Sequence, residues 1–290
     1  MNRLSTLFAA AAATGLLAAP ATALAADSSI VAGPVKLKGY DVTMTATDSG
    51  ASDSFAVIAN KKAGKSYQMH MWSFTSGINV SVKGAKATIK GNLGAFGKVN
   101  AKINAGAKAG TGVPKGCKGT GGSARKGTMT GKTKIALDTT YFKTWAPKAL
   151  KAMIVQGGKF DCSGGTKTPG TAKGLTLMSS TTGDDSLMVS ITKEGGSVFQ
   201  QVMNNKTVGS ASVMHIINAE TGAAGLEAAS DLSTAKASGV SPFLTGTLSF
   251  TGEPMGTMAS GTVSGDFAAK FDSIGTQKLP EGNDAMLMTR

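Results

Sequence analysis

The residues with the clearest chemical potential are lysines, and they gather in the first half of the chain. Residues 27–165 contain 20 lysines and one arginine, Arg125. Lysine is a point charge on a flexible stem, whereas arginine is the forked donor that reads phosphates and base edges. The composition therefore favours diffuse attraction to a polyanion over specific nucleic-acid recognition. The candidate ligand-binding residues are the basic side chains in the middle of this half, namely Lys115, Lys118, Arg125, Lys126, Lys132 and Lys134.

Two other interpretations of these lysines stay open. Lysines on exposed strands keep sheet edges from pairing with other molecules. They also complement the second half of the chain, because residues 27–165 carry 21 Lys and Arg against six acids, while residues 166–290 carry eight against 11. Neither interpretation requires a ligand.

Cys117 and Cys162 are the only cysteines, with 44 residues between them. An oxidising compartment favours their pairing, and a loop of that length gives a stabilisation of about 4 kcal/mol in the chain-entropy model. A reactive thiol or a metal pair would need partner residues that the sequence lacks. We therefore predict a structural disulfide between Cys117 and Cys162.

The two histidines each follow a methionine, in Met69-His70-Met71 and Met214-His215. Thioether and imidazole together are copper ligands. In a strand, however, Met69 and Met71 would share one face and His70 would point to the other. These methionines are predicted to fill the core, and no metal site or cofactor is predicted.

Nucleophilic catalysis finds little support. Ser123 and Ser233 each begin a Ser-x-x-Lys sequence, but the companion motifs of that enzyme class are absent. No pair of carboxylates has a sequence spacing that indicates general acid–base catalysis. We predict no catalytic residue.

The N-terminus indicates export. Arg3 precedes an apolar stretch from Leu7 to Leu17, and Ala23-Leu24-Ala25 is a small-x-small cleavage site. Residues 1–25 are therefore predicted to be a signal peptide, and the protein to be secreted or periplasmic. No transmembrane span is predicted, because no later stretch approaches 18 consecutive apolar residues.

Short alternating segments predict a mainly β protein. Val42, Met44 and Ala46 alternate with threonines, which is the period of a half-buried strand. Runs of this kind recur about every 10 residues, as in antiparallel meanders that form a barrel or a sandwich. One or two short helices are expected, at 144–151 and 222–237. The predicted strands are 55–60, 66–74, 78–83, 86–90, 97–103, 175–180, 187–193, 197–203, 211–218, 245–251 and 261–271.

The composition divides the chain into two units. The expected boundaries are a basic β unit at 26–165, a mildly acidic β unit at 166–274 and a flexible tail at 275–290. One stretch suggests a duplication, because the segment from Asp53 to Met71 matches that from Asp185 to Met203 at a constant offset of 132 residues. We therefore expect two tandem units of related structure.

A group of short motifs resembles a known kind of protein. They are Pro114-Lys115-Gly116-Cys117-Lys118-Gly119, Arg125-Lys126-Gly127-Thr128 with Gly131, Tyr141-Phe142, and Cys162. This pattern is similar to that of uncharacterised exported bacterial all-β proteins. The resemblance implies fold and export and carries no activity.

These observations predict an exported, non-catalytic binding protein. Its lysine-rich half is expected to attach to an anionic polysaccharide, a cell-wall polymer or lipid headgroups, with no specific nucleic-acid partner. The alternative is a structural or assembly protein of the cell envelope whose lysines only solubilise it. An exported hydrolase is the third hypothesis.

Overall fold

The computed structural model describes residues 28–50, 52–64, 66–112, 118–120, 122–137, 144–157, 159–161, 175–180, 185–192, 197–204, 211–220, 226–239, 242–279 and 282–289. The predicted signal peptide, both cysteines and Lys115 lie outside these residues. The chain divides into two units, each described here by itself. Unit 1 comprises 1–60, 71–166 and 206–212, and unit 2 comprises 61–70, 167–205 and 213–290.

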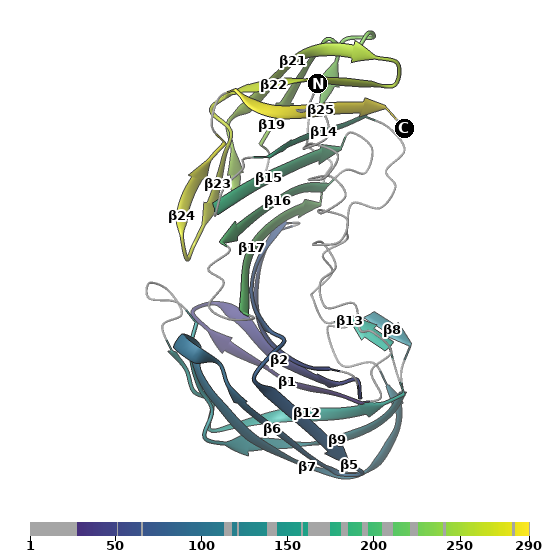
Figure 1. Cartoon of the computed structure of the whole chain (residues 1–290), viewed down its shortest axis with the longest axis vertical. Coiled ribbons are helices and arrows are strands. Elements are labelled where there is room, and N and C mark those ends of the chain that lie inside the picture. The colour runs from purple at the N-terminus through teal and green to yellow at the C-terminus, as the bar shows by residue number, and fades with distance from the viewer. Residues whose placement is uncertain are drawn as a thin grey trace. The chain divides into compact units, whose positions relative to one another are not determined.

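The predicted fold class is confirmed, because the described chain is nearly all antiparallel β and its sheets curl into half-barrels (Figure 1). In unit 1 the sheet runs in the order β3–β2–β1–β12–β9–β7–β6–β5, and β10 and β11 extend it from β7. The elements are β1 (Ser28–Leu37), β2 (Tyr40–Asp48), β3 (Asp53–Ala63), β4 (Ser66–Phe74), β5 (Ile78–Lys83), β6 (Lys86–Asn92), the 3₁₀ turn η1 (Gly94–Phe96), β7 (Gly97–Gly112), β8 (Lys118–Thr120), β9 (Gly122–Gly131), β10 (Lys134–Ala136), β11 (Thr144–Trp145), β12 (Ala149–Gln156) and β13 (Lys159–Asp161).

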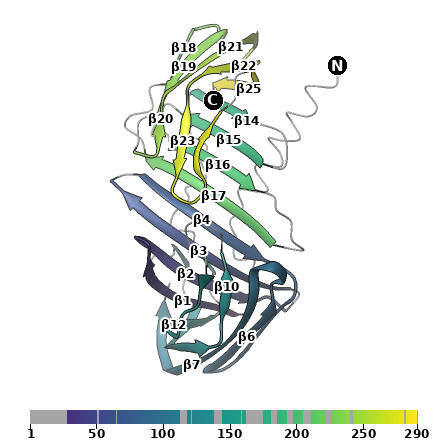
Figure 2. The ribbon, with the colours of Figure 1, turned by 90° about the vertical axis from the view of Figure 1, so that its left-hand side faces the viewer.

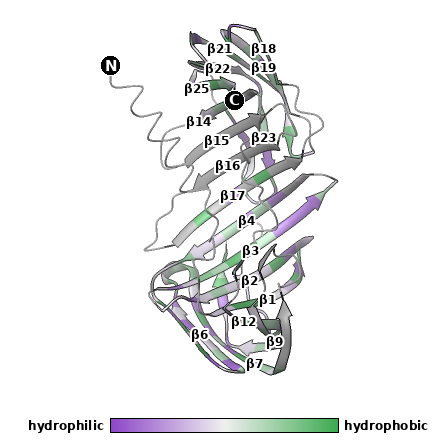
Figure 3. Cartoon of the chain, turned by 90° about the vertical axis from the view of Figure 1, so that its right-hand side faces the viewer, coloured by the Kyte–Doolittle hydropathy of each residue, from purple (hydrophilic) through white to green (hydrophobic). Residues whose placement is uncertain are grey.

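Turn chemistry and alternation explain why these segments pair. Lys38 and Gly39 form the two-residue loop between β1 and β2, and both have positive φ, at 52° and 83°. Such loops match the right-handed twist of hairpin strands. Along β6 and β7 hydrophobic and hydrophilic residues alternate (Figure 3). The inward-facing residues Ile89 and Ile103 are buried, so one face of the sheet forms the core and the other carries the polar residues.

Unit 2 contains a second antiparallel meander in the order β17–β16–β15–β14–β25–β22–β21–β19–β18. A three-stranded sheet, β20–β23–β24, shares its core (Figure 2). Phe250 and Leu287 of the meander and Phe271 of the small sheet belong to that core. The elements are β14 (Leu175–Ser180), β15 (Asp185–Thr192), β16 (Ser197–Asn204), β17 (Ala211–Glu220), β18 (Glu227–Ala228), β19 (Thr234–Ser238), β20 (Leu244–Thr245), β21 (Thr247–Met255), β22 (Met258–Gly265), β23 (Ala268–Phe271), β24 (Gly275–Lys278) and β25 (Asn283–Thr289).

The two predicted helices are wrong, because these segments form strands and turns wherever they are described. Residues 144–151 contribute β11 and the beginning of β12, in which Leu150, Ala152 and Ile154 alternate toward the core. The described part of 222–237 contributes β18, a turn and β19. No helix in the described part of the chain is long and apolar enough to span a membrane.

The predicted flexible tail is also corrected. Residues 275–278 form β24, and 283–289 form β25, which lies between β14 and β22. Ala285 and Leu287 are fully buried. Because apolar residues alternate through this strand, it is held in the core of unit 2, and the turn residues just before it do not end the fold.

Candidate functional site

Eight lysines of unit 1 project from the face of the sheet that is turned away from the core, and we call this surface the lysine face. For six of these lysines the position follows from strand alternation, since neighbours along the strand, such as Ala87, Val99 and Ile135, are buried. Lys83 and Lys126 are placed on this face by their direct pairing with Lys86 and Met153. All eight are exposed. The lysine face consists of Lys83, Lys86, Lys90, Lys98, Lys102, Lys126, Lys134 and Lys151.

The strands that carry the lysine face contain no carboxylates of their own. No Asp or Glu occurs between residues 54 and 137, so the strands β5, β6, β7, β9 and β10 contain none, and β12 contains none either. In the described part of the chain, the lysines of this face form no ion pair. The ion pair of unit 1 that the structure does show, Lys36 with Asp41 at 2.8 Å, joins β1 and β2. Within the described residues, the charge of these lysines is therefore not compensated by an ion pair.

Two pairs of these lysines lie directly opposite each other. Lys98 of β7 pairs with Lys134 of β10, and Lys83 pairs with Lys86 across the β5–β6 turn. Directly opposed side chains of an antiparallel pair have Cβ atoms about 5 Å apart, and like charges there are destabilising. These two pairs therefore place like charges side by side on the face.

A pocket opens on the same face, where β1 diverges from β12. The two strands pair from Ser28 to Ala32, and the register of β1 with β2 then shifts between Ala32 and Val35. Gly33 and Pro34 occupy this bulge, and a side chain at Gly33 would meet the carbonyl oxygen of Val42. The bulge leaves a pocket of about 220 Å³ between β1, β2, β9 and β12.

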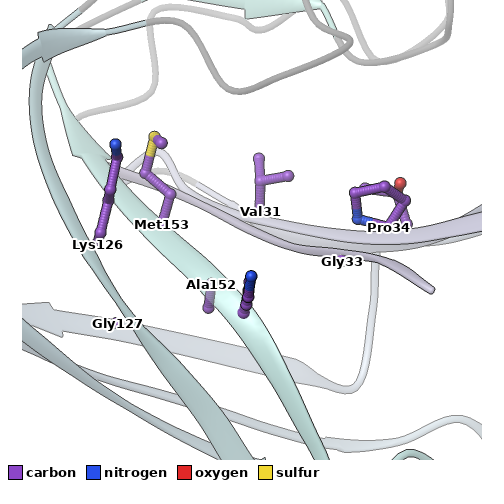
Figure 4. Close-up of a pocket in the computed structure, with 9 residues that line it drawn as sticks. Val31, Gly33, Pro34, Lys126, Gly127, Ala152 and Met153 are labelled. Atoms are coloured by element: carbon purple, nitrogen blue, oxygen red, sulfur yellow. The ribbon is translucent and has the colours of Figure 1, made fainter.

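The lining of the pocket combines positive charge with aliphatic surface. Lys126, Met153 and Val31 rise from the same side of the sheet (Figure 4), as their direct pairing across β9, β12 and β1 requires. Lys151 lies two residues before Met153 on the same face of β12 and also lines the pocket. Met153 packs against a small buried cluster of Val31, Ala124 and Val155.

The structure separates the six predicted ligand-binding residues. Lys126 and Lys134 belong to the lysine face, and Lys132 is exposed between β9 and β10. Arg125 points to the opposite face of β9, where its Nη1 donates to the carbonyl oxygen of Gly106 at 3.4 Å. Lys118 begins β8, and Lys115 lies outside the described residues. Lys151 and the pocket were not predicted from the sequence, because their place on this face depends on the pairing of β12 with β9 and β1.

Both histidines meet in the interior of unit 2. Nδ1 of His70 lies 2.5 Å from Nδ1 of His215, and Ser273 Oγ lies 3.1 and 3.3 Å from these two nitrogens. Asp272, next to Ser273, forms an ion pair with Lys61, whose Nζ lies 2.6 Å from Asp272 Oδ2. These contacts join residues 61–70 to the segment between β23 and β24, which explains why they belong to unit 2.

This histidine pair is a hydrogen-bonded element of the core. Two imidazoles on one tetrahedral metal ion hold their nitrogens about 3.3 Å apart, given metal–nitrogen distances of about 2.0 Å, so a spacing of 2.5 Å fits a shared proton. Burial lowers the pKa of His70 well below its ordinary value, and the neighbouring His215 lowers it further. Among the described residues, no three His, Cys, Asp or Glu side chains are placed to hold a metal ion together.

The Ser-x-x-Lys segment in unit 2 belongs to a turn. Ser233 Oγ donates to Asp231 Oδ1 at 2.7 Å, and the backbone N–H of Ser233 donates to the same oxygen at 3.0 Å. These hydrogen bonds lower the pKa of Asp231. The hydroxyl of Ser233 is thus used to shape the loop before β19.

Comparison of the chain with protein-family models, with curated proteins and with solved structures finds no match.

Proposed function

We propose that this protein is an exported, non-catalytic binding protein that attaches through its lysine face to an anionic polymer or lipid surface. The observation that carries the proposal is the gathering of eight lysines on one face of a sheet whose strands β5, β6, β7, β9, β10 and β12 contain no carboxylate. Charges of one sign on one face raise the local concentration of anionic partners.

The dimensions of the face favour an extended partner. Lys98 and Lys102 lie four residues apart on β7, or about 14 Å, and β6, β7, β9 and β12 are neighbours spaced about 4.8 Å apart. A single small anion contacts only one or two of these lysines. A polymer or a membrane surface contacts many at once, so its affinity adds up over several weak charge contacts.

We also propose that the protein is exported and that it contains a disulfide. The signal peptide at 1–25 would bring the chain to an oxidising compartment, and Cys117 and Cys162 would pair there.

The internal duplication also remains a proposal. It is supported by the first strands of the two matching segments, because β3 begins at Asp53 and β15 begins at Asp185, 132 residues later.

The test is retention on anionic vesicles and on immobilised polyphosphate over a salt series. We expect affinity to fall steeply with salt, because screening shortens the reach of exposed charge. The triple variant K86T/K90T/K102T should bind at least tenfold more weakly. The matched control K236T/K270T/K278T removes three exposed lysines of unit 2 and should bind like the wild type. If the wild type is not retained on either probe, or if retention ignores salt, the proposal fails and the structural role is favoured.

A further inference from the structure

The pocket at the β1–β12 fork lies on the lysine face, but its chemistry differs from that of the rest of the face. Elsewhere the lysines are separated by threonine and asparagine, such as Thr88, Asn100 and Thr130. In the pocket, two lysines border an aliphatic floor made by Val31, Pro34 and Met153. A ligand that contacts both the two lysines and the aliphatic floor must carry a negative charge next to a saturated hydrocarbon segment.

We infer that this pocket binds the headgroup region of one anionic lipid molecule. The inference rests on the proposed function and names its partner as a lipid surface. Lys126 and Lys151 would hold the phosphate, and the glycerol and first methylenes would lie against Met153, Val31 and Pro34. Thr43, which also lines the pocket, offers a hydroxyl to the headgroup.

The size of the pocket supports a headgroup and excludes a whole lipid. Its 220 Å³ holds roughly seven groups the size of a water molecule, each taking about 30 Å³. Pockets for drug-sized ligands are larger, at about 300–1,000 Å³. The remainder of a bound lipid must therefore stay in its bilayer, which places the membrane against the lysine face.

The lining also discriminates against polymers that bind by stacking. None of the described residues around the pocket is aromatic, whereas bases of single-stranded nucleic acids bind by stacking on aromatic side chains. Methionine adapts its shape to irregular aliphatic partners. Stable attachment to a membrane requires two weak membrane contacts acting together. The polybasic lysine face would supply one, and the lipid bound in the pocket would supply the other.

The experiment measures binding of a short-chain phosphatidylglycerol that stays monomeric, by titration calorimetry with the full mature protein. The pocket variant K126M/K151M is compared with K98M/K134M, which removes the same charge from the same face away from the pocket. We expect the pocket variant to lose at least tenfold in affinity and the control less than about twofold. Both variants should unfold at temperatures close to that of the wild type.

Further probes separate the headgroup from the aliphatic segment and from polymers. M153T should weaken binding of the lipid but leave binding of inorganic phosphate unchanged. If inorganic phosphate binds as tightly as the lipid, or if both lysine pairs weaken the lipid equally, the inference is overturned. If polyphosphate and vesicles bind but the monomeric lipid does not, the pocket inference fails and the proposed function stands. If none of them binds, both fail.

Discussion

Nδ1 of His70 and Nδ1 of His215 lie 2.5 Å apart in the interior of unit 2, where His70 is fully buried and His215 is 3% exposed. One of these nitrogens must carry a proton and the other must accept it. A second proton would set two N–H groups against each other between two buried side chains. The pair therefore ties folding of unit 2 to pH.

This arrangement predicts that stability falls on mild acidification. In the folded chain the pKa of His70 is lowered, while in the unfolded chain it returns to about 6.5. Below about pH 6.5 the unfolded state therefore binds more protons, and the free energy of unfolding decreases by up to about 1.4 kcal/mol per pH unit until the lowered pKa is reached. Above pH 7 this contribution is constant. Denaturant unfolding from pH 5 to 8 measures the slope.

The control is the double variant H70Q/H215Q, which contains no histidine, since the chain has only two. It should be less stable than the wild type at pH 7.5, because the amides do not reproduce the imidazole geometry. Its stability should be nearly constant between pH 5.5 and 7.5. A slope in that range equal to that of the wild type would show that the pair is not its source.

A second prediction concerns the opposed lysines Lys98 and Lys134. Replacing Lys134 by threonine removes a like-charge pair, so we expect the unfolding free energy to rise by about 0.2–1 kcal/mol at low salt. The gain should disappear at high salt. Lys102→Thr is the matched control, because Lys102 faces Thr88 and Thr130 across its neighbouring strands. An equal gain from both substitutions would show that general charge reduction, and not the pair, is responsible.

A third prediction concerns the close approach of β7 and β9. A Cβ atom at Gly127 would lie 2.5 Å from Cα of Ala105, so Gly127→Ala must push the two backbones apart. Overpacking of this kind costs about 1–3 kcal/mol. Gly106→Ala is the control, since its Cβ would meet its nearest neighbour, the carbonyl oxygen of Lys126, at 3.8 Å. Thermal unfolding should separate the two variants, and equal midpoints would contradict the predicted clash.

The sequence allowed the strands to be predicted because alternation is a local property. Residues 66–74 and 78–83 were predicted with the bounds that the structure has. The helix at 222–237 was predicted because Leu226, Ala229 and Leu232 lie three residues apart, as on one helical face. It was wrong because Leu226 and Leu232 are buried around turns of unit 2. The tail was misjudged because Gly282 and Asn283 signal a turn, while the alternation of Ala285 and Leu287 just after them was given too little weight.

The site was less accessible to sequence reasoning because it depends on long-range register. That lysines of β6, β7, β9 and β12 share a face follows only once Lys102 is paired with Thr130, and Met153 with Lys126. The contact between His70 and His215 joins positions 145 residues apart. What the sequence did contain was the charge asymmetry between the halves and the absence of acids around the lysines.

The last prediction returns to Cys117 and Cys162, which lie outside the described residues. Next to them, β8 and β13 pair with Lys118 opposite Asp161 and Thr120 opposite Lys159. Cys117 directly precedes β8 in the sequence, and Cys162 directly follows β13. Opposed positions on antiparallel strands have Cα separations of about 4.5–5.5 Å, which a disulfide spans without strain.

If the protein is exported as proposed, we expect it to carry this disulfide and to lose about 4 kcal/mol of stability when the disulfide is reduced. Intact-mass measurement should show the mature chain two hydrogens lighter than its reduced form. Denaturant unfolding with and without reductant measures the energy, and C117S/C162S is the control whose midpoint should ignore the reductant. Free thiols in protein isolated from an oxidising compartment would contradict the pairing, as would a wild-type midpoint that does not move on reduction.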